Sequence, residues 1–220
     1  MNIGVLGTGM VGETIATALT EKGHNVRMGS RTENNERAAA WVKRSNNHAT
    51  QGTFYDAAAF GEIIFLCLNG EHALEVTRNI PRDSIEGKIV IDITNPLDFS
   101  RGLPPAILDG LGNTNSLGEE IQKAVPAASV VKVLNTVNCK LMVDPKLVNN
   151  GDHHLFICGD DRVAKNKVKH FLVDTFDWRA ENLLDLGGIQ SARCVEAYVP
   201  LWVAIMQAKG SPMFNLKIVT

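Results

Sequence analysis

The sequence lacks the features that mark several classes of protein. Its four cysteines are far apart and form no CxxC pair, which argues against a zinc site or a disulfide framework and favours a reducing, cytoplasmic setting. A net charge of −2 gives no electrostatic reason to expect binding to nucleic acid or to an anionic membrane. The most apolar stretch, "CVEAYVPLWVAIM" at 194–206, contains Glu196 and is too short to span a bilayer.

Other absences bear on targeting and domain organisation. The start, "MNIGVLGTGM", has no basic region and no small-residue cleavage site, so we expect no signal peptide. The chain contains no internal repeat, no low-complexity tract and no obvious linker. Its 220 residues, 45% hydrophobic and 21% charged, are typical of a globular protein with one domain and a small additional lobe.

Apolar runs typical of buried strands alternate along the chain with segments of helical periodicity. Strands are expected at 2–6, 24–30, 61–70, 87–96, 129–137, 153–159 and 178–183, with a final one at 214–219. Helices are expected at 10–22, 34–44, 71–79, 115–124, 162–176 and 190–209. This alternation predicts an α/β fold with a doubly wound parallel sheet and right-handed crossovers.

The stretch "GTGMVG", Gly7 to Gly12, joins the first expected strand to the first expected helix. In a dinucleotide-binding turn, Gly7 allows the tight turn, Gly9 lets the backbone approach a pyrophosphate, and Gly12 lets the helix pack on the strand. A plain strand–helix turn needs only one of these glycines. We therefore expect a Rossmann domain at 1–144 that binds a dinucleotide, and a small C-terminal α/β lobe at 145–220 with an acceptor pocket and dimer contacts.

The second expected strand ends at "GSR", where NAD-specific domains carry an acidic residue about 20 residues beyond the glycines. Here Ser30 and Arg31 hold that place. A hydroxyl followed by a guanidinium suits the 2′-phosphate of NADP(H), whereas a carboxylate would repel it. Arg37 is a candidate second cation, the alternative being a solvated residue on a helix surface. The stretch favours NADP(H) over NAD(H).

Four motifs are informative in combination: "GSR" at 29–31, "NGEHA" at 69–73, "FICGDD" at 156–161 and "SARCVEAYVPL" at 191–201. Together they resemble the coenzyme F420-dependent NADP oxidoreductase family, over nearly the whole chain. The stretch "VVKVLNT" at 130–136 also resembles the cytosolic reductase domain of the six-transmembrane metalloreductases. The resemblance implies a hydride transfer between NADPH and an 8-hydroxy-5-deazaflavin.

The resemblance also implies places for individual residues along the cofactor. The pyrophosphate would be met by Thr8, Met10 and Val11, and the 2′-phosphate by Ser30 and Arg31. The ribose and the nicotinamide would be bordered by Leu68 and Asn69. The nicotinamide amide would lie close to the segment from Asn135 to Cys139, which includes Asn138 and would act largely through its backbone.

Two further positions bear on the resemblance. The tail around Phe214 matches the place where the family packs a residue against the deazaflavin, so we expect Phe214 and Asn138 to contact the substrate. Asn35 stands where the family has a lysine, four residues beyond Arg31. This departure implies either a weaker grip on the 2′-phosphate or its replacement by Arg37.

The chain shows no Ser/Tyr/Lys reductase pattern and no paired carboxylates at a strand end. Hydride transfer from a nicotinamide to a ring acceptor needs no protein nucleophile, because the cofactor carries the chemistry while the protein stacks the rings and excludes water. We expect no metal site. In "DHH" at 152–154, adjacent side chains point to opposite sides of a strand, and we interpret the two histidines as solvated loop residues.

Two polar residues are candidates with a plainer alternative. His72 lies one turn into a helix that begins at the ligand edge of the sheet, and it is a candidate acid or base. We favour local hydrogen bonding near the helix start over catalysis for this residue. Asn95 is expected in a loop that lines the cofactor, the alternative being a simple end to the strand.

The leading hypothesis is an NADPH-dependent oxidoreductase whose acceptor is a deazaflavin such as coenzyme F420, or a flavin such as FMN or FAD. Alternatives are an NADPH-dependent flavin or ferric reductase, and a small imine or ketone reductase; the last class usually adds a larger helical domain than residues after 145 allow. A non-enzymatic alternative is an NADPH-binding redox sensor. The last expected helix carries enough apolar surface, at Tyr198, Leu201, Trp202 and Met206, to predict a symmetric homodimer.

Overall fold

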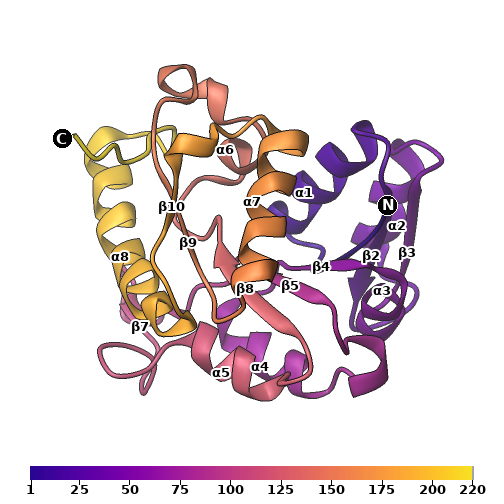
Figure 1. Cartoon of the computed structure of the whole chain (residues 1–220). Coiled ribbons are helices and arrows are strands. Elements are labelled where there is room, and N and C mark those ends of the chain that lie inside the picture. Colours follow the sequence, from indigo (N-terminus) through magenta and orange to yellow (C-terminus); the bar gives the residue numbers. More distant parts are fainter. Residues whose placement is uncertain (220) are drawn as a thin grey trace.

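Figure 1 shows the computed structural model of the chain, which describes residues 1–219. Within these residues, an eight-stranded sheet has the order β10-β9-β8-β5-β4-β1-β2-β3. Its strands are β1 (Asn2–Leu6), β2 (Asn25–Ser30), β3 (Ala49–Thr53), β4 (Ile63–Leu66), β5 (Ile89–Asp92), β8 (Ser129–Val133), β9 (Leu155–Cys158) and β10 (Leu183–Asp185). A separate antiparallel pair consists of β6 (Leu97–Asp98) and β7 (Ala106–Ile107).

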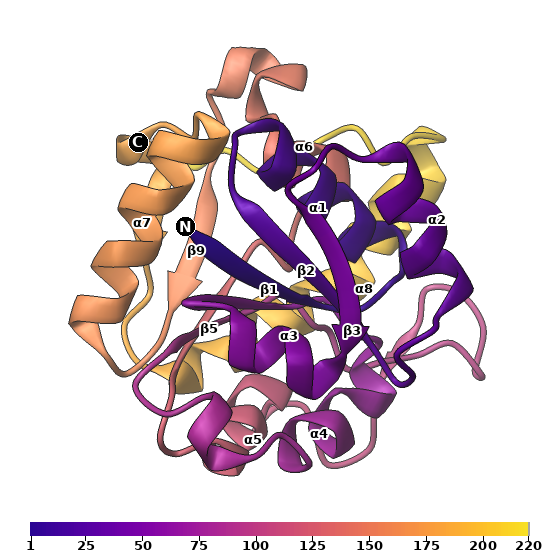
Figure 2. The same cartoon turned by 90° about the vertical axis from the view of Figure 1, so that its right-hand side faces the viewer.

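Helices cover both faces of this sheet (Figures 1 and 2). They are α1 (Met10–Glu21), α2 (Glu36–Arg44), α3 (Phe54–Phe60), α4 (Gly70–Arg78), α5 (Leu117–Ala124), α6 (Cys139–Val143), α7 (Arg162–Phe176) and α8 (Ala192–Lys209). Because successive side chains of a strand point to opposite faces, Val5 and Leu6 enter different cores. Val5 packs in the core with α1, α2, α6 and α7, and Leu6 in the core with α3, α4, α5 and α8.

The order of the strands positions a ligand site. β1 pairs in parallel with β2 on one side and with β4 on the other, so the connections reverse direction between β1 and β4. In open α/β sheets, ligands bind beyond the carboxyl ends of the strands at such a switch point. The expected doubly wound α/β fold is confirmed, with one difference: β9 runs antiparallel to β8, so the sheet is mostly and not wholly parallel.

The sequence interpretation missed two elements at the edge of the sheet, β3 and α3. The strand "ATQGT" is polar because it lies at an edge, and it pairs with β2 alone. A capping box joins the two elements: Thr53 Oγ1 accepts from Asp56 N at 3.1 Å, and Asp56 Oδ2 accepts from Thr53 N at 2.8 Å. That Ser/Thr-x-x-acid pattern was a usable signal for the start of a helix.

The strand expected at 178–183 is wrong. Residues Ala180–Asn182 form a turn of 3-10 helix, and β10 begins only after it. Asn182 stabilises this turn, because its backbone N–H donates to Arg179 O at 3.0 Å and its side-chain amide donates to Gly151 O at 2.9 Å. These two bonds hold a turn where a strand was expected.

The strand expected at 214–219 is also wrong, and so is the solvated state expected for the two histidines. The tail has no strand pairing and lies against them instead: Leu216 O accepts from His154 N at 2.9 Å. His153 is 2% exposed, and its Nε2 lies 2.9 Å from Pro145 O while its Nδ1 lies 2.8 Å from the amide nitrogen of Asn215. The alternating pattern of the tail therefore reflects packing onto these histidines.

The strands that follow residue 145, β9 and β10, extend the same sheet as the strands before it. The division into 1–144 and 145–220 stays a prediction. Within the described residues, no helix combines the length and the apolar character that crossing a bilayer would need.

Candidate functional site

The turn between β1 and α1 contains three glycines with different structural demands. Gly7 has a φ of 128°, and a Cβ added there would lie 2.2 Å from Cys67 O. A Cβ on Gly12 would lie 2.1 Å from Gly7 O. Gly9, the residue before α1, has ordinary extended backbone angles, and a Cβ there would meet nothing within 4 Å. Packing explains Gly7 and Gly12, whereas the space over Gly9 is left open for another molecule.

This open space belongs to a cleft of about 380 Å³ at the carboxyl ends of β1, β2 and β4. The cleft brings together most of the residues assigned to the phosphates and the adjacent ribose, namely Gly7, Thr8, Gly9, Ser30, Arg31, Arg37, Leu68 and Asn69. Arg31 and Arg37 are exposed, and neither side chain makes a hydrogen bond or an ion pair within residues 1–219. Two uncompensated cations thus border a glycine turn whose helix presents free N–H groups.

Ser30 and Asn35 shape the loop between these cations. The buried hydroxyl of Ser30 donates to Thr32 O, so its hydrogen holds the loop while its oxygen can still accept. Asn35 is the N-cap of α2, and its Oδ1 accepts from Arg37 N and from Ala38 N, each at 3.1 Å. Asparagine is one of the best N-cap residues and lysine is not, which gives a physical reason for the departure at Asn35.

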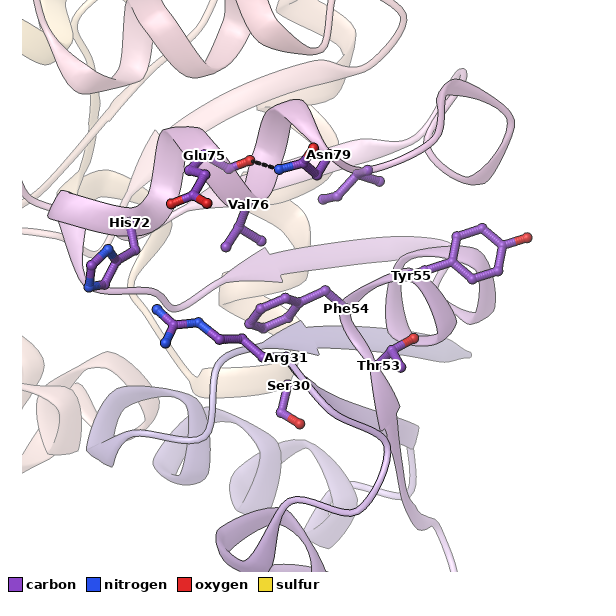
Figure 3. Close-up of a pocket in the computed structure, with 10 residues that line it drawn as sticks. Ser30, Arg31, Thr53, Phe54, Tyr55, His72, Glu75, Val76 and Asn79 are labelled. Carbon is purple, nitrogen blue, oxygen red and sulfur yellow. Dashed lines mark hydrogen bonds between the residues drawn. The ribbon is translucent and has the colours of Figure 1, made fainter.

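A neighbouring pocket of about 400 Å³ extends from Ser30 and Arg31 toward α3 and α4. In Figure 3, the guanidinium of Arg31 extends toward the imidazole of His72, with the ring of Phe54 and the side chain of Val76 beside them. The sequence interpretation missed Phe54 and Val76, because α3 was not expected and an isolated valine on a helix carries no functional signal. The ring of Phe54 and the side chain of Val76, beside the cation of Arg31, suit the face of an adenine base.

His72 makes no side-chain hydrogen bond to the rest of the described chain, so its ring is not held by the local bond that we favoured from the sequence. The side chain is exposed and lines both pockets on this side of the switch point. It is absent from the residues that line the pocket on the other side. A chemical role for His72 stays a prediction.

That other pocket, of about 210 Å³, begins at Met10 and Val11 and continues to the ends of β5 and β8 and to α8. It brings together the predicted residues Met10, Val11, Asn95, Asn135, Asn138 and Cys139, with Val137 of the same segment, and four residues that the sequence interpretation missed: Ile93, Met142, Val199 and Trp202. Gly12, also predicted at the cofactor, lines neither this pocket nor the first cleft. Phe214 is not among them, but its ring stacks on Trp202 with 5.3 Å between ring centroids and an interplanar angle of 21°.

Asn95 and Asn135 form a reciprocal pair at this pocket. Asn95 Nδ2 donates to Asn135 O and Asn135 Nδ2 donates to Asn95 Oδ1, each at 2.9 Å. Asn135 Nδ2 also lies 3.2 Å from Val195 O of α8. The pair therefore ties two strand ends to α8, which a simple end of strand at Asn95 would not do.

Asn138 and Asn69 are helix caps in this structure. Asn138 Oδ1 accepts from Lys140 N at 3.0 Å, and Asn69 Oδ1 accepts from Glu71 N at 3.0 Å. Cys139 is buried, as is Cys158, where burial raises the pKa of the thiol to about 12. Within residues 1–219 no group of three or more His, Cys, Asp or Glu side chains could hold a metal ion.

Comparison with known proteins identifies the chain. A family model described as NADP oxidoreductase, coenzyme F420-dependent, matches residues 2–96. A solved structure from Arthrobacter sp. FB24, assigned as an F420-dependent NADP-reductase, is 38% identical, with 99% of both chains covered and a TM-score of 0.90. The chain belongs to the coenzyme F420-dependent NADP oxidoreductase family. The protein is therefore an NADP-dependent oxidoreductase, and NADP(H) is confirmed as its cofactor.

Two other proteins are similar to this chain at lower identity. Metalloreductase STEAP3 of Rattus norvegicus is 32% identical over 203 residues, which are 90% of this chain. The chain spans 36% of the length of that curated relative. An imine reductase of Streptomyces aurantiacus is 16% identical with a TM-score of 0.63, over 94% of this chain and 64% of that one, and this likeness shows the fold alone.

Proposed function

We propose that the protein transfers a hydride between NADP(H) and a planar ring acceptor, either a deazaflavin such as coenzyme F420 or a flavin such as FMN or FAD. The carrying observation is the stacked pair of Trp202 and Phe214 beside the pocket that begins at the glycine turn. Aromatic rings with this offset geometry suit the face of another flat ring. The matched family supports the same class of acceptor.

The residues available at the first cleft fit NADP(H). Arg31 and Arg37 would hold the 2′-phosphate, and the first N–H groups of α1, beyond Gly9, would hold the pyrophosphate. No acidic side chain stands at the end of β2 to repel the phosphate. When bound, the nicotinamide supplies the hydride, and the chain contributes binding, orientation and exclusion of water.

Two buried polar atoms support a polar ring substituent at the second pocket. Asn135 Oδ1 and Trp202 Nε1 have no hydrogen-bond partner within the described chain, and both residues line this pocket. One is an acceptor and the other a donor, and buried polar groups are almost always paired in native proteins. A carboxamide, or a ring bearing N–H and C=O groups, would satisfy both after a small side-chain adjustment.

A second candidate function is the reduction of ferric ions or free flavin with NADPH. The metalloreductase relative supports it, although this chain matches only part of that protein. A redox sensor that binds NADPH without turnover is the non-enzymatic alternative. The homodimer expected through α8 stays a prediction.

The function is tested by mixing the protein with NADPH and following the absorbance near 340 nm, about where reduced nicotinamide absorbs. Coenzyme F420, FMN, FAD and a ferric chelate are the acceptors. Consumption of NADPH with F420 or a flavin supports the proposal, and consumption with the ferric chelate alone supports the second candidate. Tight NADPH binding with no turnover of these four acceptors would refute both candidate functions and favour the sensor.

The 2′-phosphate assignment is tested with Arg31→Ala. Loss of one charged hydrogen-bonding group costs about 1.5–3 kcal/mol, so the Kd for NADPH should rise about 10- to 150-fold while the Kd for NADH hardly changes. Arg162→Ala is the matched control, because Arg162 is also an exposed arginine but lies at the start of α7, outside the three pockets described above. Equal losses for NADPH and NADH with Arg31→Ala would refute the assignment.

A further inference from the structure

Three charged side chains are buried together in the core between the sheet and α8. Asp92 ends β5, Lys132 lies within β8 and Glu196 lies in the second turn of α8. Lys132 Nζ is 2.9 Å from Asp92 Oδ2 and 2.7 Å from Glu196 Oε1. The side chains of Asp92 and Lys132 are 0% exposed, and that of Glu196 is 3% exposed.

The hydrogen bonds of this triad are complete. The third bond of the Lys132 ammonium goes to Thr94 O at 2.6 Å. The two oxygens of Glu196 accept from Leu117 N and Gly118 N, each at 2.9 Å, in the first turn of α5. The triad carries one net negative charge, and the positive end of the α5 dipole compensates it. Burial alone would lower the pKa of Lys132. The two carboxylates outweigh burial and raise this pKa above its ordinary value, so the lysine stays charged at neutral pH.

Stability alone is a weak reason for such a group. Replacing a buried ion pair by neutral side chains of similar size is often neutral or stabilising, because desolvation offsets the Coulomb attraction. What the triad provides is a defined geometry between elements that are distant in the sequence. The partners of Lys132 come from β5, from the residues just beyond β5 and from α8, so directional bonds join these elements to β8.

The triad is connected to the second pocket through nearby residues, beginning with Ile93, which follows Asp92 and lines the pocket. Thr94, which bonds Lys132, precedes Asn95, and Lys132 itself lies three residues before Asn135. Glu196 follows Val195, whose carbonyl accepts from the Asn135 side chain. Farther along the same helix, Val199 and Trp202 form the α8 wall of the pocket. A shift of α8 would therefore displace both the amide pair and the aromatic wall.

We propose that Glu196, through Lys132 and Asp92, is a positioning residue that sets the nicotinamide half of the site without touching the cofactor. This inference rests on the proposed function, because it takes the second pocket as the place of the nicotinamide. The bonds of Glu196 to α5 position the whole of α8, because the two helices pack closely: a Cβ on Gly118 would lie 2.9 Å from that of Ala192. The half of the site proposed for the adenosine phosphates lies across the switch point, and no triad residue lines its pockets.

The test is Glu196→Gln, which keeps the shape and removes the charge. Two ligands separate the halves of the site: adenosine 2′,5′-bisphosphate, which carries only the adenosine end, and NADPH. We expect the Kd for the bisphosphate to change less than about twofold and the Kd for NADPH to rise about tenfold. With the acceptor that the wild-type protein uses, kcat should fall about 100-fold, the cost of a misplacement of roughly 1 Å.

Glu119→Gln is the matched control, because the Glu119 side chain also joins α5 to α8, through Arg193, but its hydrogen bonds go to Arg193 and Ser116 and not to the triad. It should leave both Kd values and kcat unchanged. If Glu196→Gln does not fold, a neutral variant combining Asp92→Asn, Lys132→Met and Glu196→Gln replaces it, with the same expected pattern.

The outcomes are distinct. The inference would be overturned by an unchanged ratio of the two Kd values together with a wild-type kcat. A purely structural role of Glu196 predicts this result, with or without a fall in the melting temperature. Failure of the wild-type protein to bind adenosine 2′,5′-bisphosphate would instead refute the proposed cofactor site. Equal weakening of both ligands would also overturn the inference, because the triad would then support the whole fold.

Discussion

Replacing Gly9 with alanine separates binding from folding in this protein. Gly9 is exposed, has a φ of −81° and a ψ of −178°, and offers its Cβ open space. Alanine adopts these angles without strain, and it loses less backbone entropy on folding than glycine, which is worth about 0.4–1 kcal/mol at a compatible site. The free energy of unfolding should therefore stay the same or rise slightly.

The binding of NADPH should respond in the opposite direction. The second glycine of the turn is where the backbone approaches the pyrophosphate, and a methyl group there would hold the phosphates away from the N–H groups of α1. Charge-assisted hydrogen bonds are worth about 1.5–3 kcal/mol each. Weakening one or two of them costs about 2–4 kcal/mol, so the Kd should rise about 30- to 700-fold.

Isothermal titration with NADPH and thermal unfolding measure the two quantities on one preparation. Gly12→Ala is the comparison, because its Cβ would lie 2.1 Å from Gly7 O and the resulting overpacking should cost about 1–3 kcal/mol of stability as well as binding. Binding of NADPH to Gly9→Ala within twofold of wild type would refute the reasoning. So would a loss of stability equal to that of Gly12→Ala.

Two further predictions concern a helix cap and an ion pair. Asn35→Lys should raise NADPH affinity by as much as about tenfold, because it adds a cation near Arg37. It should also cost about 1 kcal/mol of stability, because α2 loses the cap on Arg37 N and Ala38 N. Titration with NADPH and NADH measures the first effect, and a melting curve measures the second. Hydrogen bonds from Arg193 hold the pKa of Glu119 below its ordinary value, so their stabilisation is present above a pH of about 4.5 and is lost as the pH falls through the lowered pKa. Melting temperatures from pH 3 to 6 should therefore fall less steeply for Glu119→Gln than for wild type, and parallel curves would contradict this.

The part of the fold that could be predicted from the sequence is the part built from neighbours in the chain. The first strand, the glycine turn and the first helix are contiguous, so their hydrophobic periods and the glycine spacing predicted both the element order and the ligand edge. The strand β3, and with it α3, was missed because an edge strand pairs with only one neighbour and its sequence is correspondingly polar. The tail was misassigned because alternation also arises when a segment packs on isolated side chains, as it does on His153.

The candidate site divides in the same way. The place of Ser30 and Arg31 in the first cleft could be predicted from one strand, since it depends on a position relative to the glycines. The second pocket depends on residues such as Asn95 and Asn135, 40 positions apart, and on α8, which only the tertiary structure brings to them. One signal was present: a lysine inside the apolar strand "VVKVL" has to find a buried partner, and "IVIDIT" carries the acid that it finds. This pair of charges, in strands buried on both faces, is the feature from which we infer that the structure fixes geometry, and it lies behind the pocket that we propose for the nicotinamide.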